Sequence, residues 1–236
     1  MSHLSHYSHD SRACPVVGSH RSQRGILPAI AASTLLLLLA ALPCKDLYAT
    51  SLFSLSIDEV AEDAELIFEG AVLNREARVA TASGIIHTYV TFSISEVIKG
   101  DYSGAQLELR FTGGEANGEI VEVSGLTLPA AGEQGIYFVE SLNRDLVNPL
   151  LGWSQGHYLI VERDGEQQIT TNDRQPVTSV QAQDQVPAAL RRPQRIIDGK
   201  HAAATGVVTS NAAALSVERP LTPAQFKARI RALLEP

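Results

Sequence analysis

Hydrophobic and polar residues alternate with a period of two through most of the central part of the chain. The segment LIFEGAVL places Leu66, Phe68 and Val72 on one side of an extended backbone. Such alternation is typical of a strand that buries one face and exposes the other. We therefore predict a strand over 66–73, with these three side chains in the core.

The same alternation recurs further along the chain. In IIHTYVTFSISEVIKG, the residues Ile86, Val90, Phe92 and Ile94 share one side, and polar or hydroxyl-bearing residues share the other. AQLELRF repeats the pattern, with its leucines and phenylalanine facing inward. Both segments are predicted strands with a single buried face.

Turn-forming segments rich in glycine, asparagine and aspartate separate these strands, and four further strands are predicted at EIVEVSG, GIYFVES, GHYLIVERDG and EQQITTN. The pair Asp164-Gly165 between the last two is suited to a tight hairpin turn. No helical period occurs between the strands, which excludes alternating βαβ units. We therefore predict a mostly β fold: an antiparallel β-barrel or sandwich of six to seven short strands, with one short helix before it and an amphipathic helix after it.

Two capping boxes mark the predicted helices. Ser56 stands three residues before a glutamate in SIDEVAEDA, and Thr222 stands three residues before a glutamine in LTPAQFKARIRALL. In this arrangement each side chain bonds a backbone amide that the first helical turn leaves without a partner. The second helix carries an apolar stripe that includes Phe226 and Ile230. This stripe either packs on the β domain or binds another protein.

The chain divides into four predicted parts: a signal peptide over 1–49, a β-barrel or sandwich domain over 50–172, an irregular arm or linker rich in Pro, Ala and Gln over 173–220, and the C-terminal helix over 221–236. In the first part, arginines precede an uncharged apolar run over 26–42, and Ala49 is a small residue suited to a cleavage site. An uncleaved anchor is the alternative, because this run is close to the roughly 17 residues that span a bilayer. A lipoprotein signal fits poorly, because Pro43 directly precedes Cys44.

Cleavage of the leader would change the charge and the thiol content of the protein. It removes two of the 26 acidic and four of the 19 basic residues, which leaves a net charge of −9. Such a charge disfavours nucleic acid or anionic lipid as the main partner. Both cysteines, Cys14 and Cys44, are also lost, so no disulfide, thiolate metal site or cysteine nucleophile is expected. We predict a periplasmic or extracellular protein with no membrane span after cleavage.

The pentapeptide GWSQG over 152–156 matches G-x-S-x-G, the turn on which many serine hydrolases carry their nucleophile. That turn leads from a strand into a helix, whereas the residues after Gly156 are typical of a strand. An acid and a histidine do follow in hydrolase order, at Asp173 or Asp198 and at His201. We favour a structural turn, with no catalytic residue, and keep catalysis by Ser154 as the alternative. No zinc-type histidine spacing follows the leader, so no metal and no cofactor are predicted.

Several segments together resemble a group of exported bacterial β-domain proteins: AELIFEGAV, VTFSISEVIKG, LRFTGG, AAGEQGIYFVE and GWSQGHYLIV. The resemblance covers about 64–172. It implies a fold similar to netrin-like or OB-like barrels. Some members occur together with matrixin-type metalloproteases, which implies a substrate-like, inhibitory or accessory role near a secreted protease. The resemblance implies no catalytic residues.

The predicted function is that of an exported, non-catalytic domain that binds a protein partner. Binding residues collect on loops at one end of a rigid domain. We therefore predict a binding face made of Trp153, His157 and Tyr158 together with the loop over 113–118, and a second contact through Phe226 and Ile230. A serine hydrolase and a purely structural envelope protein are the alternatives.

Overall fold

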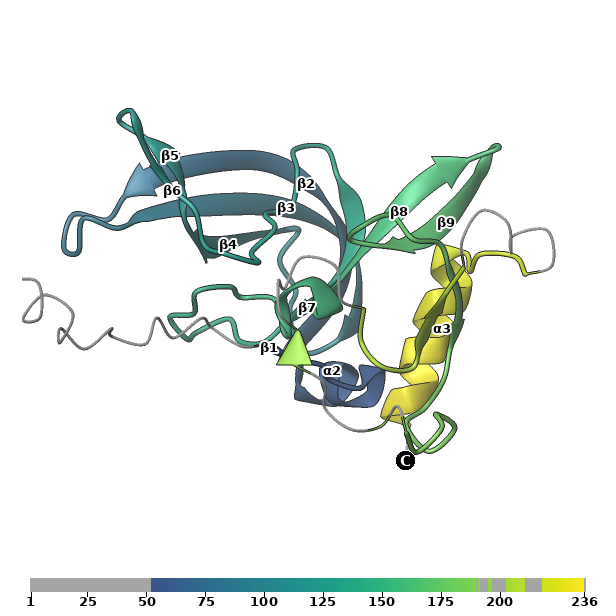
Figure 1. Cartoon of the computed structure of the whole chain (residues 1–236). Coiled ribbons are helices and arrows are strands. Elements are labelled where there is room, and N and C mark those ends of the chain that lie inside the picture. The colour runs from purple at the N-terminus through teal and green to yellow at the C-terminus, as the bar shows by residue number, and fades with distance from the viewer. Residues whose placement is uncertain (1–51, 190, 192–194, 197–202, 211–217, 236) are drawn as a thin grey trace, which may run out of the picture. The chain divides into compact units, whose positions relative to one another are not determined.

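The structure is a computed structural model that describes residues 52–189, 191, 195–196, 203–210 and 218–235. The chain divides into two units between Ala49 and Thr50, and every described residue belongs to the second unit. Figure 1 shows its elements: β1 (Leu52–Phe53), α2 (Ile57–Asp63), β2 (Leu66–Val79), β3 (Ile86–Lys99), β4 (Gln106–Thr112), β5 (Gly114–Ala116), β6 (Glu119–Val121), β7 (Gln134–Val139), the 3-10 turn η1 (Trp153–Gly156), β8 (His157–Arg163), β9 (Glu166–Thr171), β10 (Val177–Val180), β11 (Arg195–Ile196), β12 (Val207–Thr209) and α3 (Pro223–Leu234).

A six-stranded sheet in the order β4-β3-β2-β7-β8-β9 forms the centre of the fold, and every pair of neighbouring strands in it is antiparallel. Two-stranded pairs join β1 to β11, β5 to β6 and β10 to β12. The mostly β, antiparallel prediction is confirmed. Within the described residues β4 does not pair with β9, so the fold is sandwich-like and not a closed barrel. The strands are also not uniformly short, because β2 and β3 each span 14 residues.

Two hydrophobic cores lie on opposite faces of this sheet. Leu66, Phe68 and Tyr137 belong to one core, and their sequence neighbours Ile67 and Phe138 belong to the other. In β7, every residue from Gly135 to Val139 is buried. A strand covered on both faces has no polar side, so it appears in the sequence as an uninterrupted apolar run.

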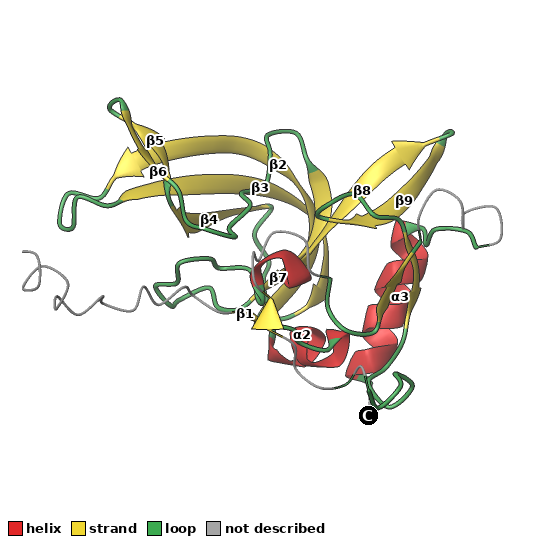
Figure 2. Ribbon diagram, in the orientation of Figure 1, coloured by secondary structure: helices red, strands yellow, loops and turns green. Residues whose placement is uncertain are grey.

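Both predicted capping boxes form. The Ser56 amide donates to the Glu59 carboxylate at 2.7 Å, and the Glu59 amide donates back to the Ser56 hydroxyl at 3.2 Å. Thr222 and Gln225 make the same reciprocal pair at the start of α3. Both helices pack against the core on the face opposite Phe68, where α2 contacts α3 (Figure 2).

One predicted turn and part of the predicted arm can be followed in detail. Asp164 and Gly165 both have positive φ angles, and they join β8 to β9 in a two-residue hairpin. In the arm, Val177 and Val180 are buried in the core, so this part is docked on the domain. Leu190 and Ile197, two further aliphatic residues of the arm, lie outside the described residues.

Candidate interaction surface

The GWSQG segment forms a tight structural junction. Gly152 and Trp153 both have positive φ angles, η1 makes one 3-10 turn, and the chain then enters β8 directly. A Cβ atom on Gly156 would lie 2.4 Å from the Leu151 carbonyl oxygen, so only glycine fits there. The Gln155 amide group accepts from the Leu55 amide at 2.7 Å and donates to the Phe53 carbonyl at 3.0 Å.

This geometry lacks the strand-to-helix turn that a hydrolase nucleophile requires. Ser154 is buried, and β8 begins three residues after it. Asp173 accepts a hydrogen bond from the Thr171 hydroxyl. Asp198 and His201, the other predicted partners of Ser154, lie outside the described residues.

Trp153, His157 and Tyr158 do not form one exposed face. Trp153 is partly exposed, whereas His157 is 1% exposed and Tyr158 is fully buried. Because consecutive residues of a strand point to opposite faces, His157 lies beside Tyr137 and Tyr158 lies beside Phe138 in the other core. The predicted face is therefore wrong for these two residues.

The predicted second contact also lies in the interior. Phe226 and Ile230 are both fully buried, and the Phe226 ring lies 4.9 Å from the Tyr158 ring. Of the two alternatives for the stripe of α3, the structure thus has it packed on the domain. Neither residue is available for a partner while α3 is docked.

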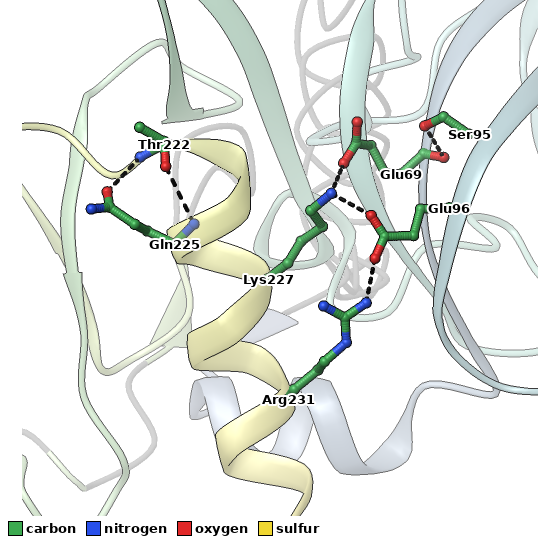
Figure 3. Close-up of polar contacts among 7 residues, drawn as sticks. All are labelled: Glu69, Ser95, Glu96, Thr222, Gln225, Lys227 and Arg231. Carbon is green, nitrogen blue, oxygen red and sulfur yellow. Dashed lines mark hydrogen bonds and ion pairs between the residues drawn. The ribbon is translucent and has the colours of Figure 1, made fainter.

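Ion pairs on the flank of α3 help to hold the helix in this position. Lys227 lies between the carboxylates of Glu69 on β2 and Glu96 on β3, and Arg231 also pairs with Glu96 (Figure 3). The Lys227 and Glu69 side chains are mostly buried. The sequence places Lys227 and Arg231 on the polar side of the helix but does not indicate which carboxylates they meet.

This cluster predicts a pH dependence of stability. Hydrogen bonds from Lys227 and then Arg231 hold the pKa of Glu96 below its usual value. A carboxyl with a lowered pKa in the folded state stabilises the fold above its unfolded pKa of about 4.3, and this stabilisation is lost as the pH falls through the folded value. Urea unfolding of the parent protein and of Glu96→Gln should therefore differ most near neutral pH and converge in acid. A difference that stays constant with pH would contradict this assignment.

A buried polar cluster that the sequence did not predict lies at the start of β7. His157 Nε2 is 2.7 Å from Glu133 Oε1, and the Tyr137 hydroxyl donates to the same carboxylate oxygen at 3.2 Å. Burial, followed by the charge of Glu133, raises the pKa of Tyr137. The carboxylate therefore serves to satisfy two buried polar side chains. The pairing of Tyr137 with His157 across β7 and β8 is a long-range feature, so only knowledge of the strand register could have revealed it.

An exposed groove of about 670 Å³ lies beside the β5–β6 hairpin, and we call it the hairpin groove. Its apolar lining includes Ile120, which is 67% exposed and the most exposed large hydrophobic residue of the described chain. Its charged lining residues are Arg75, Glu115 and Glu122. The remaining lining residues are Thr112, Gly113, Gly114, Val121, Val123, Ser124, Leu126, Thr127 and Leu128.

The backbone on one side of the hairpin groove is held firmly against the sheet. The Thr88 hydroxyl donates to the Gly113 carbonyl at 2.7 Å, and a Cβ atom on Gly114 would lie 2.3 Å from the same hydroxyl oxygen. Gly114 also has a φ angle of 130°, which other residues rarely adopt. Gly113, Gly114 and Glu115 of the predicted loop thus line this groove, whereas Trp153, His157 and Tyr158 do not.

A second groove, of about 870 Å³, runs between the β8–β9 hairpin and the start of α3. Its lining is mixed in charge, with Glu69, Arg163, Glu166, Arg219 and Lys227 among its residues. Lys227 and Glu69 already pair with each other, so the groove has no single charge that would select a ligand.

Within the described ranges, no three histidine, cysteine or acidic side chains gather in a way that could hold a metal ion. No helix in the same part of the chain is long and apolar enough to span a membrane. No family model, curated protein or solved structure matches this chain.

Proposed function

We propose that this chain is an exported, non-catalytic domain that binds a protein partner through the hairpin groove. The observation that carries the proposal is the 67% exposure of Ile120 in a groove whose lining mixes aliphatic side chains with charged and hydroxyl ones. Burial of a large aliphatic side chain in this position by a partner lowers the free energy of the complex.

The lining of the hairpin groove supports a particular kind of contact. Val121, Val123 and Leu126 are partly exposed and offer an apolar surface, whereas Arg75 and Glu122 are exposed charges beside it. An apolar centre with a polar rim is the usual anatomy of a protein–protein interface. The partner is thus a protein that presents a bulky apolar side chain, and the family resemblance makes a secreted metalloprotease the first class to examine.

Replacing Ile120 with serine is expected to weaken partner binding by about tenfold or more, since loss of a central apolar contact commonly costs this much. The measurement is quantitative capture from the periplasm and culture medium of the source organism by the immobilised protein. Phe53→Ser is the matched control, because Phe53 is 55% exposed but does not line the hairpin groove.

Three outcomes would contradict the proposal. Equal loss of capture in both variants would place the contact elsewhere. The absence of any stoichiometric partner would favour a structural envelope protein. Labelling by a fluorophosphonate probe that Ser154→Ala abolishes would favour a hydrolase.

A further inference from the structure

The outer half of β2 is an open sheet edge. β7 pairs with β2 only from Leu66 to Ala71, and the loop before β7 still bonds Val72 through its amide and carbonyl groups. On the other side, β3 continues to pair with β2 as far as Val79. From Leu73 to Val79, β2 therefore has a neighbouring strand on one side only, within the described residues.

The ladder between β2 and β3 determines which backbone groups face this edge. The Ala80 amide donates to the Ile85 carbonyl at 2.8 Å, and the Gly113 amide on the far side of β3 donates to the Ile86 carbonyl at 2.8 Å. Because antiparallel ladder bonds alternate along a strand, Arg75, Ala77 and Val79 direct their amide and carbonyl groups away from β3. Among the described residues these groups have no hydrogen-bond partner.

Unpaired edges commonly carry charges that prevent association with other strands, but here the signs of the charges alternate. When two copies pair as antiparallel strands, the residues whose backbone groups point away from β3 must lie opposite one another to form hydrogen bonds. This requirement leaves only a few positions for the two-fold axis. An axis at Arg75 or Arg78 places two arginines opposite each other, and an axis at Glu76 places two glutamates opposite each other. Only an axis at Ala77 brings Glu76 opposite Arg78 of the second copy, twice. Each copy already pairs its own Arg78 with its own Glu76 at 2.6 Å, so this axis gathers four charges of alternating sign at the seam.

We propose that two copies of this chain associate through the edge 75–79 of β2, as an antiparallel pair with Ala77 on the two-fold axis. The Ala77 side chain lies beside Gly114 of its own copy, where a Cβ atom on Gly114 would be 3.2 Å from the Ala77 Cβ, and its small size leaves room for the close approach of two strands. Arg75 lies opposite Val79 of the second copy, so its aliphatic stem covers a valine that is 36% exposed in the single chain. The same patch on each copy meets its equal, as a closed two-fold dimer requires.

Charge-swap variants test the register. Glu76→Arg places two arginine pairs opposite each other and should raise the dimer dissociation constant by about tenfold or more. Arg78→Glu should have a similar effect. The double variant restores both opposite-charge pairs and should dimerise to within about threefold of the parent protein. Analytical ultracentrifugation over a concentration series measures all four proteins.

A cysteine cross-link tests the position of the axis. With Cys14 and Cys44 replaced by serine, Ala77→Cys should form an intermolecular disulfide under mild oxidation, because opposite Cα atoms of a hydrogen-bonded pair lie about 5.5 Å apart. Asn74→Cys is the control, since this residue is also exposed on β2 but would lie about 20 Å from its equivalent in the proposed register.

The proposal is overturned if the parent protein sediments as a monomer at every concentration, if the double variant stays dissociated, or if Asn74→Cys cross-links as readily as Ala77→Cys. Binding of a different protein to this edge, without a dimer, would also overturn it. Ile120→Ser should leave the dimer intact, because Ile120 lies outside the edge 75–79, although Arg75 belongs to both this edge and the hairpin groove.

Discussion

Replacing Phe226 with alanine is expected to lower the free energy of unfolding by about 3–5 kcal/mol, as for other fully buried aromatic residues. Phe226 is fully buried, and its ring contacts that of Tyr158. The truncation would leave a cavity between α3 and β8 that the surrounding strands cannot fill. Urea denaturation followed by the fluorescence of Trp153, the only tryptophan in the chain, measures the change.

Arg229→Ala is the matched control, because Arg229 is exposed on the same helix and the substitution should change stability by less than about 0.5 kcal/mol. If Phe226→Ala instead left the unfolding free energy unchanged but abolished capture of a partner, the stripe of α3 would be a binding surface. That result would contradict the packing of α3 described above.

Replacing Gly135 with valine is expected to lower the free energy of unfolding by about 3 kcal/mol or more, because the site has no space for side-chain atoms. A Cβ atom there would lie 2.6 Å from the Tyr158 carbonyl oxygen and 3.0 Å from Cζ of Tyr137. Gly135 also faces Gly70 across β2 and β7, and the Phe68 ring lies 3.0 Å from the corresponding point on Gly70. Aromatic rings thus cover both glycines, and the same urea unfolding experiment measures the effect of filling one of them.

The neighbouring substitution Gln134→Val is the control for Gly135→Val. Gln134 lies in the same strand but is exposed, and valine suits a strand. We expect a change of less than about 0.5 kcal/mol. Equal destabilisation by the two substitutions would mean that β7 is sensitive to any change and that the space above Gly135 is not the cause.

Features that depend on neighbours in sequence were predictable here. The capping residues Ser56 and Thr222 and the Asp164-Gly165 turn act within a few residues of chain, so a short segment contains the whole signal. The inward side of β3 was equally accessible, because Val90 and Phe92 alternate with polar residues on a strand that has one solvated face.

Features that depend on what covers a second face were not predictable. His157 and Tyr158 were expected at a rim, yet both are buried, because His157 packs beside Tyr137 and Tyr158 lies in the core on the opposite face. The outer half of β2 was missed because its side chains are exposed, and not because a second core buries them. Its side chains from Asn74 to Glu76 are exposed and carry no alternation of apolar and polar residues, although β3 holds the backbone extended.

The groove that we propose for binding overlaps the predicted binding face in part. Gly113, Gly114 and Glu115 of the predicted loop line the hairpin groove, but Ile120 was not singled out, because a hydrophobic residue in a short strand normally indicates burial. Glu133 was also missed, since its contact with His157 joins a turn to a strand 24 residues later.

The burial of β7 on both faces has a consequence for how the domain comes apart. Tyr137 and Val139 belong to one core and Ile136 and Phe138 to the other. Because β7 supplies side chains to both cores, neither core can unfold while β7 remains packed in the other. Heating should therefore disrupt the two cores in one cooperative transition, with no intermediate that retains half of the domain.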